Sequence, residues 1–165
     1  MIILVAGLPG SGKSYFATRL ASHLGAVYIS SDKVRKSLDG MGKYTLEDKL
    51  SVYKGMADLA EASLTKGEKV VLDATFHLKN MRSLIHTLAD KHSSDIYFIY
   101  IEAGEELIKK RVAKERPDSE ADFEVYKKIK GEFEAIDVPH LNLLSTDSNI
   151  TEMIQEAKHY IYKQR

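Results

Sequence analysis

The sequence of 165 residues contains no cysteine, which excludes disulfide bonds, thiolate metal sites and cysteine nucleophiles. It also lacks a net charge, because 24 Lys and Arg balance 24 Asp and Glu. Proteins that bind long nucleic acids usually carry a basic excess, so any nucleic-acid contact should be local and short. No apolar run approaches the ~20 residues of a membrane span, and the apolar start at residues 1–5 is too short and uncharged for a signal peptide. These absences favour a cytoplasmic protein.

Five short apolar segments alternate with helical patterns along the chain. The alternation predicts βα units on a parallel sheet, and the continuous apolar character indicates strands buried on both faces. The length fits one compact domain, so we expect a single α/β domain over residues 1–165. The expected strands are residues 2–6, 27–29, 69–73, 95–101 and 141–145.

Apolar residues recur at helical spacing between these segments, for example over residues 81–89 and 150–161. A longer stripe over residues 46–64 starts at Thr45 with Asp48 three residues later, a pattern close to a capping box. Residues 109–131 read as helical but highly charged, so we expect them to form a mobile lid. A last stripe within and beyond this lid joins Val125, Ile129, Phe133 and Ile136.

Residues 7–14 match the phosphate-binding pattern G-x-x-x-x-G-K-[ST] in full. The match follows an expected strand and precedes a helical pattern, so the loop amides and about half a positive charge at the helix start would face an anion. Lys13 can reach the β- and γ-phosphates of ATP, and the Ser14 hydroxyl can ligate magnesium. The residues expected to bind the nucleotide are Gly7, Pro9, Gly10, Ser11, Gly12, Lys13, Ser14 and Tyr15.

The remaining sequence favours a kinase among proteins with this loop. The D-x-x-G letters at residues 39–42 follow charged residues instead of a strand, and residues 65–68 lack the Asp of a GTPase base-reading motif. Motor and AAA-type ATPases need further domains and arginines from neighbouring subunits, for which this chain is short. A compact kinase, with ATP and acceptor bound by one domain and a lid, is what remains.

Asp32 follows the second expected strand, at the sheet edge where α/β proteins bind ligands. A carboxylate that orients or deprotonates an acceptor hydroxyl is typically worth ~10²–10⁴ in rate. The alternative is a helix N-cap, a very common role for Asp in this setting. Spacing alone favours neither the catalytic role nor the N-cap role. Arg35 lies one helical turn further on and would face the same cleft.

Asp73 ends an apolar run, the Walker B pattern, and would hold magnesium directly or through water. The alternative is an Asp that starts an Asx turn. Thr75 and Arg82 follow and are candidates for contacts with the acceptor. Among the six histidines, only His77 is placed to approach a substrate.

Residues 109–116 hold five cations in eight positions, among them Arg111 and Arg116. On a closed lid, an arginine at the β–γ bridge can be worth ~10³–10⁵ in turnover. A solvated helix face is the usual role of such a charge run, and the pattern by itself favours that alternative.

Taken together, residues 7–14, Asp32 with Arg35, residues 71–75, and Arg111 with Arg116 resemble the phage and bacterial polynucleotide 5′-kinases. They are more similar still to small P-loop kinases often labelled AAA-family ATPases, a group related to zeta-toxin-like kinases. The resemblance covers residues 1 to about 145. It implies a three-layer α/β/α P-loop fold with a five-stranded parallel sheet in the order 2-3-1-4-5 and a helical lid.

The resemblance also implies the roles of the site residues. Asp32 would be the general base, Arg35 would hold a phosphate of the acceptor, and Lys13, Ser14 and Asp73 would handle ATP and Mg²⁺. A lid arginine, Arg116 or Arg111, would complete the catalytic set. No membrane and no obligate protein partner are inferred.

The same resemblance suggests the 5′-OH of a polynucleotide or nucleotide as the acceptor. Characterised polynucleotide kinases usually carry a phosphatase or ligase domain, which this chain lacks, and the charge balance offers no track for a strand. Kinases of gluconate, shikimate and antibiotics use the same scaffold, so a small metabolite is the alternative acceptor. A sensor module that binds ATP without transferring phosphate is a further alternative.

Overall fold

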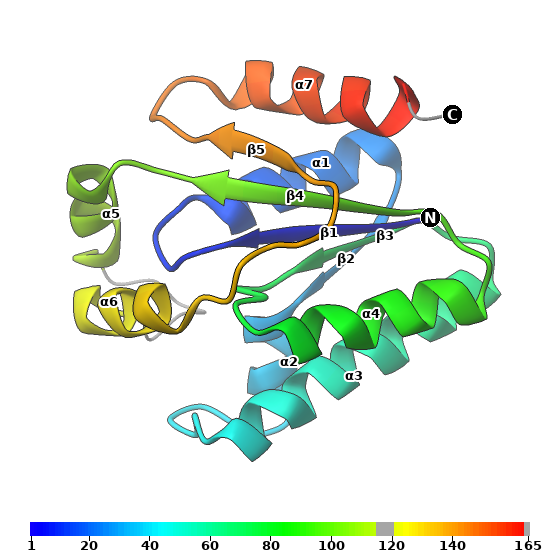
Figure 1. The fold of residues 1–165 in the computed structure, drawn as a ribbon, viewed down its shortest axis with the longest axis horizontal. Helices are drawn as coiled ribbons and strands as arrows, with labels where there is room; N and C mark the ends of the chain where they lie inside the picture. The colour runs from blue at the N-terminus through cyan, green and yellow to red at the C-terminus, as the bar shows by residue number, and fades with distance from the viewer. Residues whose placement is uncertain (115–120, 164–165) are drawn as a thin grey trace.

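The computed structural model describes residues 1–114 and 121–163. Five parallel strands form one sheet in the order β2-β3-β1-β4-β5 (Figure 1), which confirms the predicted order. Each observed boundary lies within one residue of the expected one, since continuous apolar runs mark the strands clearly. The strands are β1 (Ile2–Gly7), β2 (Val27–Ser30), β3 (Val70–Asp73), β4 (Ile96–Glu102) and β5 (Leu141–Leu144).

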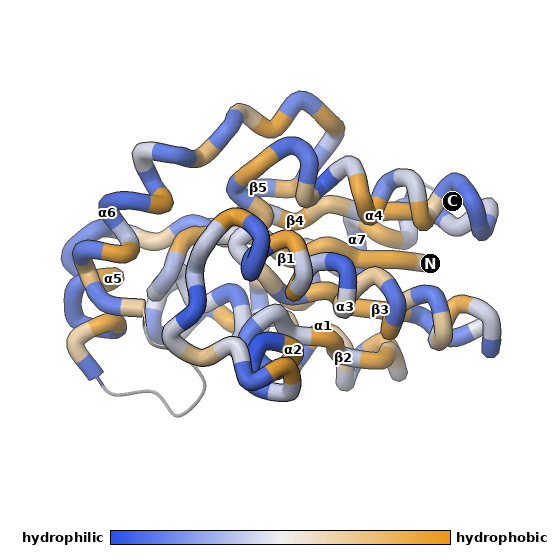
Figure 2. Tube along the Cα trace, turned by 90° about the horizontal axis from the view of Figure 1, so that it is seen from below, coloured by the Kyte–Doolittle hydropathy of each residue, from blue (hydrophilic) through white to orange (hydrophobic). Residues whose placement is uncertain are grey.

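Helices cover both faces of this sheet. Figure 1 shows α1 (Lys13–Leu24) and α7 (Ile150–Lys163) on one face, with α3 (Leu46–Thr65) and α4 (Lys79–Lys91) on the other. Side chains alternate along the strands, so Ile2 and Leu4 pack in the core under α3 and α4, whereas Ile3 and Val5 pack under α1 and α7. Figure 2 shows that the strands, for example β1, are mainly apolar, whereas apolar and polar residues alternate along the helices.

The expectation of burial on both faces is wrong for β5. This strand lies at the edge of the sheet, and Leu144 is 61% exposed while Leu143 is buried. An edge strand has a neighbour on one side only, and one helix, α7, covers it. Its apolar run therefore indicated a strand correctly but overstated how deeply that strand is buried.

The capping box at the start of α3 is confirmed. The Thr45 hydroxyl accepts from the Asp48 amide at 3.2 Å, and the Asp48 carboxylate accepts from the Thr45 amide at 3.0 Å. The first turns of α3 project beyond the core, where Leu46 is 57% exposed, and burial begins at Val52.

Two helices stand at the carboxyl end of the sheet, α5 (Glu105–Val112) and α6 (Phe123–Glu132) (Figure 1). Ile108 and Tyr126 pack them together in a small separate cluster. The predicted stripe from Val125 to Ile136 is wrong as a single helix face, because α6 ends at Glu132 and the backbone of Phe133 is extended. The expected lid, residues 109–131, comprises the end of α5 and most of α6, and its residues 115–120 lie outside the described part of the chain.

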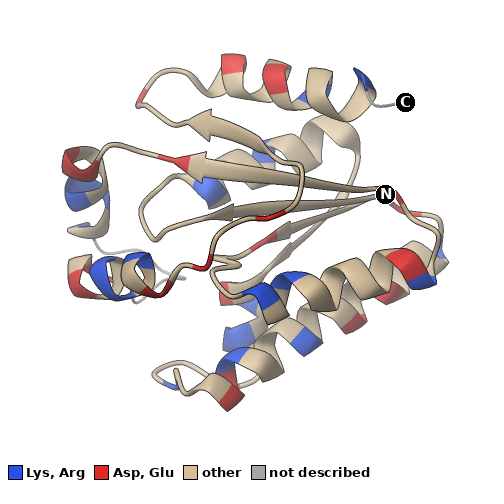
Figure 3. Ribbon diagram, viewed as in Figure 1, with Lys and Arg blue, Asp and Glu red and all other residues tan. Residues whose placement is uncertain are grey.

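The strands carry few charged residues, as Figure 3 shows, whereas charged side chains are frequent on the helices, including α5 and α6. Within the described ranges, no helix combines the length and the apolar character needed to cross a membrane. The short helix α2 (Ser31–Ser37) follows β2 directly and brings Asp32 to the end of the sheet where α5 and α6 stand.

Candidate active site

The loop between β1 and α1 has the backbone of a phosphate-binding loop. Gly12 precedes α1 with φ 91°, a conformation that L side chains rarely adopt. A Cβ at Gly12 would lie 2.8 Å from the Ser145 hydroxyl and 3.1 Å from a nitrogen of Arg111. At Gly7 a Cβ would come within 2.6 Å of the Ile101 carbonyl oxygen. Glycine is therefore required at both positions, and α1 begins with Lys13 and Ser14 at the wall of a cavity, a helix start of the kind that binds anions.

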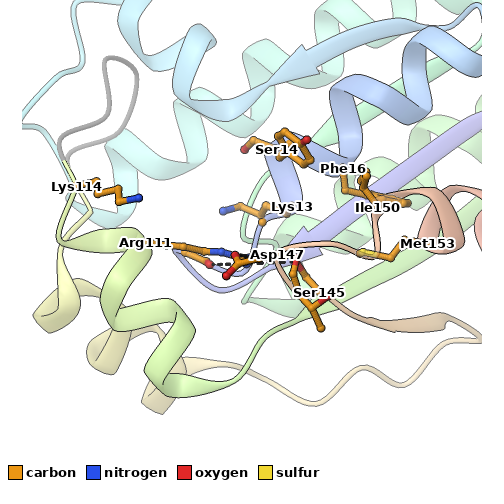
Figure 4. Close-up of a pocket in the computed structure, with 13 residues that line it drawn as sticks. Lys13, Ser14, Phe16, Arg111, Lys114, Ser145, Asp147, Ile150 and Met153 are labelled. Carbon is orange, nitrogen blue, oxygen red and sulfur yellow. Dashed lines mark hydrogen bonds and ion pairs between the residues drawn. The ribbon is translucent and has the colours of Figure 1, made fainter.

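Two cavities meet at this loop, and Lys13 and Ser14 line both. The first, of about 490 Å³, lies between the loop and the start of α7 (Figure 4). The second, of about 520 Å³, extends to the opposite side, among α2, α3 and α6. Volumes of this size are typical of small-molecule sites.

The first cavity combines an apolar wall with a few polar groups. Phe16, Ile150 and Met153 supply the apolar side chains, and Ser145 and Asp147 lie across from them (Figure 4). Such a lining suits a flat ring held by apolar contact and oriented by a few hydrogen bonds. Tyr15, expected at the nucleotide, also lines this cavity, although its side chain is largely exposed and stacks on Arg19.

Arg111 joins the phosphate-binding loop to the loop between β5 and α7. Its guanidinium donates to the carbonyl oxygens of Gly10, Ser11 and Thr146 at 3.4, 3.2 and 3.1 Å. It also bonds the Ser145 hydroxyl at 3.2 Å and pairs with Asp147 at 3.4 Å (Figure 4). The interpretation of Arg111 as part of a solvated helix face is therefore wrong. The second lid candidate, Arg116, lies outside the described residues.

Asp32 and Arg35 line the second cavity together, as their spacing suggested. Arg35 contacts the Asp32 carboxylate at 3.5 Å, a long ion pair, and the side chain of Asp32 is 34% exposed. The N-cap of α2 is Ser30, and Asp32 lies within the first turn. The alternative role of Asp32 as a helix N-cap is therefore excluded by its position.

The Arg35 side chain is largely buried and its guanidinium is incompletely paired. Its side chain is 11% exposed, and its Nε has no hydrogen-bond partner among the described residues. Its Cζ lies 4.9 Å above the ring of Tyr44. A desolvated cation with a long ion pair and an unused donor favours an anionic ligand in the cavity.

Thr75 lines the same cavity within a small polar network. Its hydroxyl lies 3.3 Å from the Tyr53 hydroxyl and 3.1 Å from Nδ1 of His77, and the Phe76 amide donates to Tyr53 at 3.0 Å. Burial, with a smaller contribution from the charge of Lys49, lowers the pKa of His77 to about 4. His77 is thus neutral at neutral pH, and Thr75 is held at the cavity wall.

Asp73 is the candidate metal ligand, and its surroundings fit that role. Its side chain is 1% exposed, Oδ2 accepts a hydrogen bond from Tyr28 at 2.6 Å, and Oδ1 has no partner among the described residues. Ser14 lines the same cavity and supplies a second oxygen. Burial, followed by the charge of Asp73, raises the pKa of Tyr28, so the tyrosine remains a neutral donor.

Magnesium prefers such hard oxygen ligands, usually one or two from the protein with phosphate oxygens and water. Within the described part of the chain, no cluster of three or more His, Asp or Glu side chains could hold a metal on its own. Asp73 and Ser14 together offer two oxygen atoms of this kind beside the phosphate-binding loop. Sequence reasoning missed Tyr28 here, because its contact with Asp73 depends on the pairing of β2 with β3.

Arg82 does not line either cavity, contrary to the expectation that it contacts the acceptor. The side chain is 3% exposed and donates to the carbonyl oxygens of Phe76, Glu134 and Ala135 at 2.7, 3.3 and 2.8 Å. These contacts anchor the segment after α6 to α4. The structure gives Arg82 a stabilising position behind the site.

Replacing Arg82 with methionine should therefore lower the free energy of unfolding by about 2–3 kcal/mol, since one buried and two partly buried hydrogen bonds from a charged donor are lost. ATP affinity of the folded protein should change little. Urea denaturation and calorimetric ATP titration measure the two quantities. Lys54→Met, on the exposed face of α3 and away from both cavities, is the control that removes a surface cation. An Arg82 variant of normal stability but lower ATP affinity would contradict this assignment.

Two known proteins have sequences similar to that of this chain. An uncharacterised protein of Mycobacterium tuberculosis (strain ATCC 25618 / H37Rv) is 31% identical over 137 residues. That match covers 75% of this chain but 28% of the relative, so this chain spans little more than a quarter of that protein. A protein of Aeropyrum pernix named "Probable adenylyl-sulfate kinase" is 26% identical over 159 residues, or 92% of this chain and 86% of the relative.

Two solved structures share the fold. The APS kinase of Mycobacterium tuberculosis in complex with AMPPNP and APS has a TM-score of 0.74 at 20% identity, covering 97% of this chain and 96% of that one. A sugar kinase from Janibacter sp. HTCC2649 has a TM-score of 0.75 at 17% identity, covering 97% and 93%. A family model described as "AAA domain" matches residues 2–136, which hold the phosphate-binding loop, Asp32 and Asp73, and the chain therefore belongs to that AAA-domain family.

Proposed function

We propose that the protein is a P-loop kinase that transfers the γ-phosphate of ATP to a hydroxyl group of a second molecule. The observation that carries the proposal is the pair of cavities that meet at Lys13 and Ser14. A nucleotide in one cavity and an acceptor in the other would bring their reacting atoms together at the phosphate-binding loop. A module that only senses ATP needs the first cavity but not the second.

ATP would occupy the first cavity, with its base against Phe16, Ile150 and Met153 and its phosphates in the loop. Lys13 would contact the β- and γ-phosphates and stabilise charge that develops during transfer. Arg111, which bonds the carbonyls of Gly10 and Ser11, would keep the loop in place beside the base. The structural relative solved in complex with AMPPNP supports a nucleotide ligand for a protein of this fold.

Ser14 and Asp73 would hold Mg²⁺ together with the phosphates, as the unused Asp73 oxygen favours. When bound, the ion would neutralise charge on the β- and γ-phosphate oxygens.

Asp32 would act as the general base in the second cavity. It would accept the proton of the acceptor hydroxyl as the hydroxyl oxygen forms a bond to the γ-phosphorus. The bond from that phosphorus to the β–γ bridging oxygen would break, leaving ADP and the phosphorylated acceptor. Thr75, held by Tyr53 and His77, would contact the acceptor from the cavity wall.

The acceptor would carry an anionic group beside its hydroxyl, because Arg35 has an unused buried donor and lines the cavity. Our first candidate is the 5′-OH of a nucleotide or polynucleotide, whose adjoining phosphate Arg35 would bind. The second is a small anionic metabolite, which the cavity of about 520 Å³ and its further cations, Lys49 and Lys128, also suit. The relative named as an adenylyl-sulfate kinase is consistent with a small anionic acceptor.

A screen with γ-labelled ATP tests this function. The panel would pair 5′-OH RNA and DNA oligonucleotides, nucleoside 3′-phosphates and sugar acids with their uncharged counterparts. We expect label transfer and faster ADP release with an anionic member of one pair, and little with its neutral partner. Slow ADP release that no acceptor accelerates, but a protein partner does, would favour an ATP sensor and contradict the proposal.

A further inference from the structure

Tyr28 lies on β2, the edge strand beside β3, and its hydroxyl reaches the end of the neighbouring strand. In the register of the two strands, Tyr28 is opposite Val71 and Ser30 is opposite Asp73. Tyr28 and Asp73 are thus diagonal neighbours on one face of the sheet, a spacing that an aromatic side chain can bridge. The Tyr28 hydroxyl donates to Oδ2 of Asp73 at 2.6 Å.

This hydrogen bond divides the Asp73 carboxylate into two unequal oxygens. Oδ2 is occupied by Tyr28, while Oδ1 is buried and has no partner among the described residues. A buried carboxylate with one satisfied oxygen is costly unless a cation or donor reaches the other. Because Asp73 lines the second cavity beside Lys13 and Ser14, such a cation would meet the phosphates there.

We propose that Tyr28 is a positioning residue for the magnesium site: it fixes the Asp73 carboxylate so that the second oxygen is presented to Mg²⁺. The inference rests on the proposed function, in which Asp73 holds the ion. Outer partners of this kind orient ligands, and their loss typically lowers metal affinity about 10–100-fold. Tyr28 itself lines neither cavity and would not touch the nucleotide.

Two features of the surroundings support a fixed orientation. Residues 27–30 are paired with β3 along their whole length, so the tyrosine backbone is held. The Lys33 ammonium lies 5.0 Å above the ring of Tyr28, a cation–π contact that restricts the ring from α2. The hydroxyl is therefore carried by a residue that strand pairing holds at its backbone and that Lys33 contacts at its ring.

Tyr28→Phe tests the proposal, because it removes the hydroxyl and keeps the ring. Calorimetry would measure ATP affinity with excess Mg²⁺ and again in EDTA. Electron paramagnetic resonance would measure the Mn²⁺ affinity of the complex between the protein and a non-hydrolysable ATP analogue. We expect Mn²⁺ affinity to fall about 10–100-fold and ATP affinity to weaken only when Mg²⁺ is present. Tyr97→Phe, on β4 against Tyr160, is the matched control and should change neither.

A purely structural role for Tyr28 makes a different prediction. Tyr28→Phe would then lower the free energy of unfolding, or weaken ATP binding as much in EDTA as with Mg²⁺. Either result, together with a normal Mn²⁺ affinity, overturns the proposal. In an Asp73→Asn background, Tyr28→Phe should cause no further loss of Mn²⁺ affinity, since the two residues act as one unit. Equal ATP affinity with and without Mg²⁺ in the wild type would overturn it too. A failure of phosphoryl transfer would leave these binding results unchanged and count against the proposed function alone.

Discussion

Lys13→Ala is expected to lower phosphoryl transfer about 10²–10³-fold while leaving the fold intact. The side chain lines both cavities at the point where they meet, so it is placed to contact the phosphates before and during transfer. It is partly exposed and belongs to none of the hydrophobic clusters, so its removal opens no core cavity. Initial rates with labelled ATP and the accepted acceptor measure the loss, and circular dichroism melting checks the fold.

Lys66→Ala is the matched control, because it removes an equal charge at the exposed end of α3, away from both cavities. It should transfer phosphate at the wild-type rate. If Lys13→Ala unfolds at room temperature, the loop supports the fold and the loss of activity says nothing about phosphate binding. Near-normal transfer by a folded Lys13 variant would contradict the placement of ATP in this loop.

The sequence predicted the strands and the loop well because local signals determine them. Continuous apolar runs mark strands that helices cover on both faces, and the glycines of residues 7–14 are required by the backbone, as Gly12 illustrates. The capping box at Thr45 is likewise a contact between residues three apart. The strand order depended on resemblance to known kinases, since no local pattern specifies which strands pair.

Tertiary contacts explain why α6 ends at Glu132 although the sequence pattern predicted a longer helix. The spacing from Val125 to Ile136 fits a helix, but the amide of Glu134 donates to the carbonyl of His77 at 2.8 Å and its carboxylate accepts from the amide of Lys79. Arg82 binds the carbonyls of residues 134 and 135. These long-range hydrogen bonds hold the backbone extended and satisfy groups that a helix would otherwise pair.

The site itself was predictable only in part for the same reason. Asp32 and Arg35 are one turn apart, so their meeting in one cavity follows from the helix period. Tyr28 and Asp73 are 45 positions apart, and their contact needs the register of two strands. Arg82 follows Asp73 in the chain and was therefore a candidate for a ligand contact, but it is one of the rarely buried charged residues that the fold uses internally.

Asp32→Ala is expected to slow transfer about 10²–10⁴-fold, the typical contribution of a general base. Affinity for ATP should stay near the wild-type value, because Asp32 lines the acceptor cavity and not the first one. Single-turnover transfer and calorimetric ATP binding separate the two effects. Asp58→Ala, on the exposed face of α3, removes an equal charge as the control and should leave both unchanged.

The partner of Asp32 makes this test more specific. Removing the carboxylate takes away the one ion pair of Arg35 among the described residues, so Arg35 would become free to bind an anionic acceptor more tightly. If Asp32 is the general base, Asp32→Ala should transfer phosphate slowly, with an acceptor KM that is unchanged or lower. If the Asp32 carboxylate only orders Arg35, Asp32→Ala should have a higher acceptor KM and a preserved kcat. Wild-type kcat in Asp32→Ala would exclude proton transfer to this residue and leave Asp32 a role in ordering Arg35.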